Sequence, residues 1–88
     1  MIAMDEKLYK EVLYLLEELS GDNSVPRNIR KMAAESKAKM ENQSQRFDLR
    51  CATVMSTLDD LTNDPNVPSH GRAFLYTIMS KLEALSKS

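Results

Sequence analysis

Cysteine, glycine, proline and tryptophan are scarce: the 88 residues include one cysteine, two glycines, three prolines and no tryptophan. A single cysteine cannot form an internal disulfide, which excludes a disulfide-stapled secreted fold and makes a reducing cytoplasm the expected compartment. The apolar start Met1–Met4 runs straight into charged residues, so no signal peptide is expected. The longest apolar run, Val12–Leu16, is far too short to cross a membrane.

What is present points to a helical globular domain. Hydrophobic residues make up 42% of the chain and charged residues 28%, which argues against a disordered or collagen-like chain. The length predicts a single domain, 1–88, with one modest core. Between the few glycines and prolines, apolar residues recur with the 3.6-residue period of helices, and no segment alternates as a strand does. The four helical segments are 5–20, 26–41, 45–62 and 68–86.

The chain repeats itself with a period of 42 residues. Leu16–Ser20 aligns with Leu58–Thr62, and the loop pattern Asp-x-x-Val-Pro-x-x-x-Arg aligns as well. A chance match of two amphipathic helices would not extend into the loop. The repeat therefore predicts a tandem duplication of a helix–loop–helix unit, about 5–42 and 45–86. Two such units are expected to close on each other as an all-α four-helix bundle with approximate twofold symmetry.

Each unit contains a connecting loop whose residues are expected to be structural. The residue after the first helix, glycine or asparagine, tolerates the left-handed conformation typical of helix C-termini. A proline stands where the next helix begins, and the valine before it is expected to plug the hairpin. The aspartate is expected to accept N–H bonds at the start of the following helix. These residues are Gly21, Asp22, Val25 and Pro26 in the first unit and Asn63, Asp64, Val67 and Pro68 in the second.

An arginine follows each loop, Arg30 in the first unit and Arg72 in the second. Both are expected within reach of an acidic pair, Glu17–Glu18 or Asp59–Asp60. A structural salt bridge repeated twice is the favoured interpretation, because such ion pairs also produce repeated constellations. Two symmetric anion or substrate sites are the alternative.

Two stretches carry a resemblance to a known family. Val25–Arg30, and Asn63–Pro68 followed by His70 and Arg72, resemble the signature stretches of a small archaeal family, uncharacterised protein family 0147. The resemblance covers nearly the whole chain and implies an all-helical four-helix domain in the archaeal cytoplasm. It implies no activity and no functional residues, because the family has no established function. Glu41–Asp48 departs from the pattern, since this segment is more acidic in relatives.

No catalytic or metal-binding motif is recognisable. A di-metal site in a four-helix bundle needs two Glu-x-x-His motifs, but His70 is the only histidine and Val67 stands three residues before it. No cluster offers a zinc site, and no glycine-rich loop offers a phosphate site. Cys51 is expected to be buried rather than nucleophilic, and His70 has no identifiable partner as a base. The acidic residues at 59–64 are interpreted as a solvated helix end rather than a cation site. We therefore expect neither a cofactor nor enzymatic activity.

Charge is distributed unevenly around a net charge of −1: residues 1–25 carry −4, residues 26–50 carry +4 and residues 51–88 carry −1. Four cations of the second helix are expected on one exposed face with alanines between them, as a strip that a phosphate backbone could approach. A solvated face that complements the acidic first helix is favoured, because no aromatic residue is interleaved for base stacking. The four cations are Arg27, Arg30, Lys31 and Lys37.

Three large apolar side chains fall outside the main helical stripes: Tyr14, Leu49 and Tyr76. If Tyr14 and Leu49 are neighbours, they mark an interface to a partner or a second copy. The sequence thus favours a non-enzymatic, cytoplasmic helical adaptor or scaffold that binds an unknown protein partner or forms a homodimer, without membrane contact. An RNA- or ribosome-associated factor that uses the basic face of the second helix is the alternative.

Overall fold

The structure, a computed structural model, describes residues 5–88. It confirms the predicted all-α four-helix bundle, and no strand occurs between residues 5 and 88. Each helix matches one predicted segment to within a residue or two at its ends, as is usual for helix boundaries. The helices are α1 (Glu6–Ser20), α2 (Arg27–Met40), α3 (Phe47–Thr62) and α4 (Ser69–Ser86).

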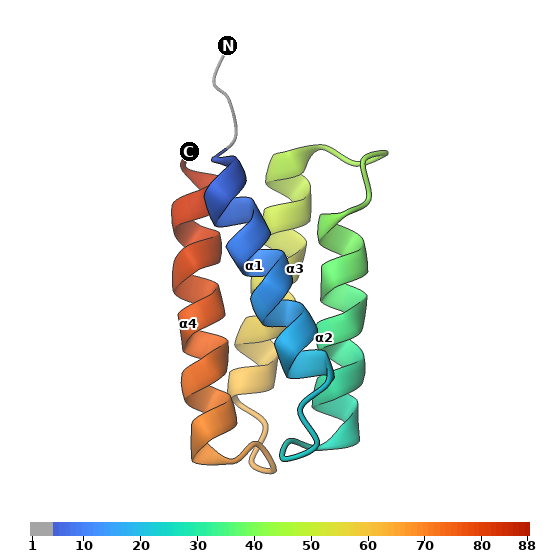
Figure 1. Ribbon diagram of the computed structural model, residues 1–88, viewed down its shortest axis with the longest axis vertical. Helices are drawn as coiled ribbons and strands as arrows, with labels where there is room; N and C mark the ends of the chain where they lie inside the picture. The colour runs from blue at the N-terminus through green and yellow to red at the C-terminus, as the bar shows by residue number, and fades with distance from the viewer. Residues whose placement is uncertain (1–4) are drawn as a thin grey trace.

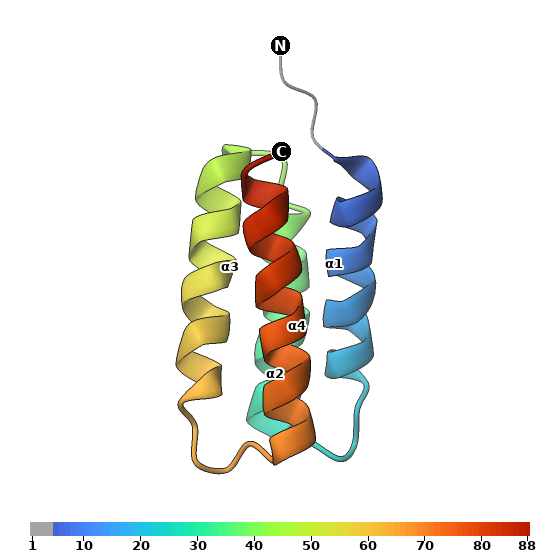
Figure 2. The same ribbon diagram turned by 90° about the vertical axis from the view of Figure 1, so that its left-hand side faces the viewer.

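The four helices form an up-and-down bundle in chain order (Figures 1 and 2). Each helix contacts the next along the chain, and α4 also contacts α1. The pairs α1 with α3 and α2 with α4 therefore lie on the diagonals. The loops 21–26 and 63–68 share one end of the bundle, while the loop 41–46 shares the other end with the C-terminus and the start of α1.

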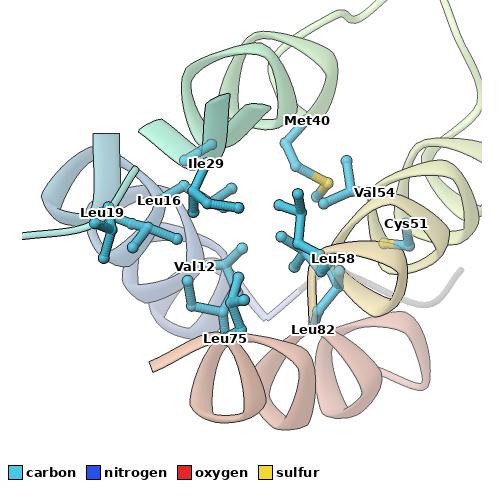
Figure 3. Close-up of a cluster of buried hydrophobic side chains, with 14 of the residues drawn as sticks. Val12, Leu16, Leu19, Ile29, Met40, Cys51, Val54, Leu58, Leu75 and Leu82 are labelled. Atoms are coloured by element: carbon cyan, nitrogen blue, oxygen red, sulfur yellow. The ribbon is translucent and has the colours of Figure 1, made fainter. Parts of the chain in front are cut away.

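The core runs along the bundle axis and receives side chains from all four helices (Figure 3). Leu16 and Leu58, which align in the 42-residue repeat, are both fully buried and come from the diagonal helices α1 and α3. Cys51 is buried at 3% exposure, as expected, and burial raises the pKa of its thiol. A thiol in this environment stays protonated and is a poor nucleophile.

Ser36 is one of two buried polar residues among residues 5–88, and unlike Thr62 it makes no side-chain hydrogen bond. Its side chain on α2 is buried, and its Oγ has no hydrogen-bond partner within the described part of the chain. A buried, unsatisfied hydroxyl costs about 1–3 kcal/mol relative to a satisfied one. Replacing Ser36 by alanine is therefore expected to raise the free energy of unfolding by about 1 kcal/mol in urea denaturation. A loss of stability instead would mean that the hydroxyl has a partner, such as a buried water.

The helix ends differ from one sequence-based expectation. Gly21 and Asn63 were expected in the left-handed conformation, but their φ angles are −100° and −92°, and residues 5–88 contain no positive φ. Pro26 and Pro68 directly precede α2 and α4 and are their N-caps. The expectation was wrong because a tight turn, rather than a left-handed residue, ends each helix. In that turn the N–H group two residues after the helix bonds the carbonyl three residues earlier.

The same turn occurs in all three loops, including the middle loop 41–46, which the 42-residue repeat leaves out. In each loop an aspartate or asparagine accepts the backbone N–H of the residue two positions later, at 2.8–3.1 Å. An arginine follows eight positions after each of these acceptors. The acceptors are Asp22, Asn42 and Asp64, and the arginines are Arg30, Arg50 and Arg72.

Candidate functional site

Val25 and Val67 close the end of the bundle that carries the loops 21–26 and 63–68. Both valines are buried, and both approach Gly71 in the first turn of α4. A Cβ atom at Gly71 would lie 3.1 Å from Val25 Cγ1 and 3.2 Å from Val67 Cγ1. Glycine therefore leaves the space that both plugs occupy, and this end of the molecule is tightly packed rather than open to a ligand.

The arginines after the loops do not form the expected salt bridges. Arg72 donates to the carbonyl oxygens of Thr62 at 3.1 Å and Asp64 at 3.2 Å, and Arg50 donates to that of Met40 at 2.7 Å. Thr62 and Met40 are the last residues of α3 and α2, so each arginine binds a carbonyl group that has no partner within its own helix, and a cation there also complements the helix dipole. The expected pairing with acidic residues was wrong for Arg72, and Arg30 contacts Asn23 instead.

Lys37, rather than Arg30, makes the ion pair with the acidic end of α1. Its Nζ lies 3.3 Å from Glu17 Oε1 across the contact between α2 and α1. Neither Arg30 nor Arg72 takes part in an ion pair among residues 5–88. The interpretation as two symmetric anion sites loses its basis, because the two arginines have different partners in the two units.

Asp22, Ser24 and His70 form a polar network that the sequence did not reveal. Ser24 Oγ lies 2.5 Å from Asp22 Oδ1, to which it donates, and 2.6 Å from His70 Nε2 on α4. The aspartates were expected to accept bonds from the following helix, but Asp22 accepts from Ser24 within its own loop. The network differs from a catalytic triad, because the carboxylate holds the serine rather than the histidine.

The second unit has a related contact in place of this network. Asn28 occupies the position that His70 has in the repeat, and its Nδ2 donates to Asp64 Oδ2 at 3.2 Å. Each loop is thus tied to the first turn of the opposite unit's second helix. The two contacts follow the approximate twofold symmetry and hold the two units together at this end.

Asp22 should make the stability of the fold sensitive to acid. Hydrogen bonds from the Ser24 hydroxyl and backbone N–H lower the pKa of Asp22 below its ordinary value. The ionised Asp22 carboxylate contributes fully to the free energy of unfolding above the unfolded-state pKa. This contribution is lost as the pH falls through the lower folded-state pKa. In urea unfolding from about pH 5 down to about pH 2, the free energy of unfolding should therefore fall less with pH for Asp22→Asn than for the wild type. Equal slopes would contradict the assignment.

The four predicted basic residues of α2 separate into two groups. Arg30 and Lys37 turn toward α1 and its loop, where they contact Asn23 and Glu17. Arg27 and Lys31 are exposed and make no ion pair in the structure from residue 5 onward. The predicted strip left out Lys39, which is exposed on the same helix and also makes no ion pair among residues 5–88. The exposed basic strip is therefore smaller than predicted.

Tyr14, Leu49 and Tyr76 are exposed at 61%, 51% and 55%, but they do not form one patch. Tyr14 lies on α1 and Leu49 on α3, which are diagonal helices, and Tyr76 lies on α4. The condition under which Tyr14 and Leu49 were to mark an interface is not met. Tyr14 also uses its hydroxyl for a hydrogen bond to Glu18 on its own helix.

A concave, mostly apolar surface lies between α3 and α4. A hollow of about 270 Å³ opens near the end that carries the C-terminus and the start of α1. Its floor is buried Cys51 and Leu82, and Ala52 and half-buried Met55 form its walls. Asp48 and Ser86 form a polar rim. A second depression is lined only by α4 residues and is thus part of the outer surface of one helix.

Within residues 5–88, no three histidine, cysteine or acidic side chains come together as metal ligands. None of the helices in this range has the length and apolar character needed to cross a membrane.

Comparison with known proteins identifies the family. The pattern of the uncharacterised protein family UPF0147 matches residues 1–85. The chain belongs to UPF0147. A UPF0147 protein of Thermoplasma volcanium is 61% identical over 88 residues, which is all of this chain and 99% of that protein. A UPF0147 protein of Methanothermobacter thermautotrophicus is 40% identical over 84 residues, covering 96% of this chain and 82% of that protein.

Solved structures of similar proteins have the same fold. A crystal structure of a UPF0147 protein from Thermoplasma acidophilum superimposes with a TM-score of 0.90 at 62% identity, covering 92% of this chain and 95% of that chain. A crystal structure of a second protein, of unknown function, gives a TM-score of 0.84 at 37% identity, covering 94% of each chain. The resemblance noted from the two loop motifs is confirmed. The family is uncharacterised, so membership in UPF0147 brings the fold but no activity.

Proposed function

We propose that the protein is a non-enzymatic helical adaptor that binds another protein through the hollow between α3 and α4. The observation that supports this proposal is the apolar concavity at the surface between α3 and α4. Apolar anchor residues in pockets supply most of the binding energy in protein interfaces. The flexible thioether of Met55 can adapt to such an anchor.

The size of the hollow favours a side chain over a small molecule. Pockets for cofactors and drug-sized ligands measure about 300–1,000 Å³ and enclose most of the ligand surface. The hollow is slightly smaller, at about 270 Å³, and its wall residue Ala52 is exposed to solvent. One or two apolar side chains on an amphipathic helix would fill a hollow of this size in the helix-in-groove mode of recognition.

A substitution that fills the hollow tests this proposal. Ala52→Trp is expected to abolish capture of a specific protein from nuclease-treated native lysate, because the indole occupies the space of the partner's anchor. Ala73→Trp is the matched control, since Ala73 is an exposed alanine on α4 that does not line the hollow. Circular dichroism checks that both variants keep their helices. The same captured proteins with the wild type and Ala52→Trp would contradict the proposal.

RNA binding is the second candidate, supported by the unpaired, exposed cations of α2. If Arg27 and Lys31 contact phosphates, their reversal to glutamate removes two contacts and weakens binding. The slope of log K against log salt should then become shallower by about 1.4, at about 0.7 per contact on single strands. Binding in an electrophoretic shift assay should then be lost at moderate salt. Lys87→Glu, just after α4, is the control for a lysine reversal away from α2. An unchanged shift with the α2 variant would exclude this function for these residues.

A further inference from the structure

α2 and α3 are neighbouring helices that expose opposite charges. The exposed side of α2 carries Arg27, Lys31 and Lys39, whereas the exposed side of α3 carries Asp59 and Asp60. None of these five side chains makes an ion pair between residues 5 and 88. The only cation of α3, Arg50, is turned inward over the ring of Phe47 at 5.1 Å.

Contacts to the other helices show which residues face outward together. On α3, Asp48 and Met55 line the hollow next to α4, so the row of Leu49, Ser56 and Asp60 lies on the side toward α2. On α2, Arg30 and Lys37 face α1 and its loop, so the row of Lys31, Glu35 and Lys39 lies on the side toward α3. These two exposed rows form what we call the α2–α3 face.

The turn between the helices sets their register. α2 ends at Met40, α3 begins at Phe47, and Arg50 is hydrogen-bonded to the Met40 carbonyl. Because both helices rise by about 1.5 Å per residue, residues equally far from the turn lie at the same level. Arg27 is therefore level with Asp60, and Ala38 is level with Leu49.

We propose that a second copy of this chain binds the α2–α3 face, with a twofold axis parallel to the helices. Such an axis places α2 of one copy against α3 of the other at the same level. Asp60 of one copy then lies opposite Arg27 and Lys31 of the second copy. Leu49, half exposed in the single chain, packs on Ala38 of the second copy. Glu35 faces the level of Ala52, where no acidic residue opposes it.

The alternative axis is disfavoured by charge. A twofold axis that runs across the helices sets α2 against α2 and α3 against α3. Cations would then face cations and aspartates would face aspartates, which is the arrangement that interfaces avoid. The parallel axis is therefore the one that the charges of this face select.

The area of the face sets the expected strength. The 16 residues of α3 span about 24 Å at about 1.5 Å per residue, and two helices packed about 10 Å apart are about 20 Å wide. The contact thus covers about 500 Å² per copy, or about 1,000 Å² in total, at the lower limit of specific interfaces. A weak dimer that dissociates with salt is expected, because its rim charges are exposed.

Sedimentation equilibrium of the purified full chain tests the dimer. The wild type should associate reversibly at micromolar to millimolar concentration, more strongly at about 0.05 M than at about 0.5 M salt. Asp60→Lys should raise the dissociation constant at least about tenfold, because it places like charges against each other twice per dimer. The double variant Arg27→Glu, Lys31→Glu should do the same. Glu83→Lys on α4, outside the face, is the matched control and should leave the dimer intact.

Mixing the two disrupted variants gives the sharpest result. Each position 60 then faces opposite charges at positions 27 and 31 of the other variant, so a heterodimer should form where neither variant self-associates. A monomeric wild type, an Asp60→Lys variant that dimerises like the wild type, or a mixture that stays monomeric would each overturn the proposal. A stronger RNA shift with Asp60→Lys, without a wild-type dimer, would assign the α2 cations to RNA instead. The dimer is measured on the purified chain and the adaptor role by capture from lysate, so this proposal and the adaptor proposal fail independently.

Discussion

Replacing Leu58 by alanine is expected to lower the free energy of unfolding by about 3 kcal/mol, within the range of about 2–5 kcal/mol for buried leucines. Leu58 is fully buried in α3 and points into the common core (Figure 3). For a domain of this size, such a loss lowers the melting temperature by about 12–24 °C. Thermal unfolding followed by circular dichroism measures it.

The repeat predicts the same loss of stability at Leu16, the position that aligns with Leu58. Leu16→Ala in α1 should cost about as much as Leu58→Ala, since Leu16 is equally buried. The double variant should be largely unfolded, because the two losses approach the about 4–13 kcal/mol expected for the whole chain. Leu49→Ala is the control on α3 and should cost less than about 0.5 kcal/mol. A large loss for Leu49 alone would contradict the assigned core.

The second large effect is expected at Gly71. Gly71→Leu should lower the free energy of unfolding by about 2–3 kcal/mol, although leucine favours helices more than glycine does. The cause is lack of space, because even a Cβ atom would come within 3.2 Å of both Val25 and Val67. Urea denaturation measures the change, and a combined Val67→Ala substitution should recover part of it.

The other glycine of the chain provides the control. Gly21 follows α1, and a Cβ atom there would meet only the Glu17 and Glu18 carbonyl oxygens at 3.8 Å and 3.9 Å, which are ordinary contacts. Gly21→Leu should therefore change the stability by less than about 1 kcal/mol. Equal losses of stability at both glycines would show that the packing of Val25 and Val67 does not depend on the missing side chain at Gly71.

The fold was predictable because its signals are local. The 3.6-residue periodicity gave the four helices, and the 42-residue repeat gave their pairing in two units. The burial of Val25 and Val67 followed from their place before a proline at the start of a helix. The diagonal placement of Tyr14 and Leu49 was also within reach, because short connections make consecutive helices neighbours and put the first and third on a diagonal.

The side-chain partners were not predictable from spacing. Arg72 lies within a sequence distance that suits Asp59–Asp60, but its guanidinium binds carbonyl oxygens whose position depends on how the turn closes. The contact between Ser24 and His70 joins residues 46 positions apart and depends on the two loops meeting at one end. The hollow depends on the relative rotation of α3 and α4. One signal was available and missed: the pattern of Asp22, Ser24 and Arg30 recurs at Asn42, Ser44 and Arg50.

The most direct test of the adaptor proposal is site-specific photocrosslinking from the hollow. A benzophenone amino acid at position 86, on the rim of the hollow, should give one discrete protein crosslink in native lysate, unaffected by nuclease, because the partner's anchor lies within reach. The same amino acid at position 73 of α4 should give none. Identical crosslinks from both positions, or a crosslink at position 86 that disappears with nuclease, would contradict the proposal that this UPF0147 protein binds a protein partner between α3 and α4.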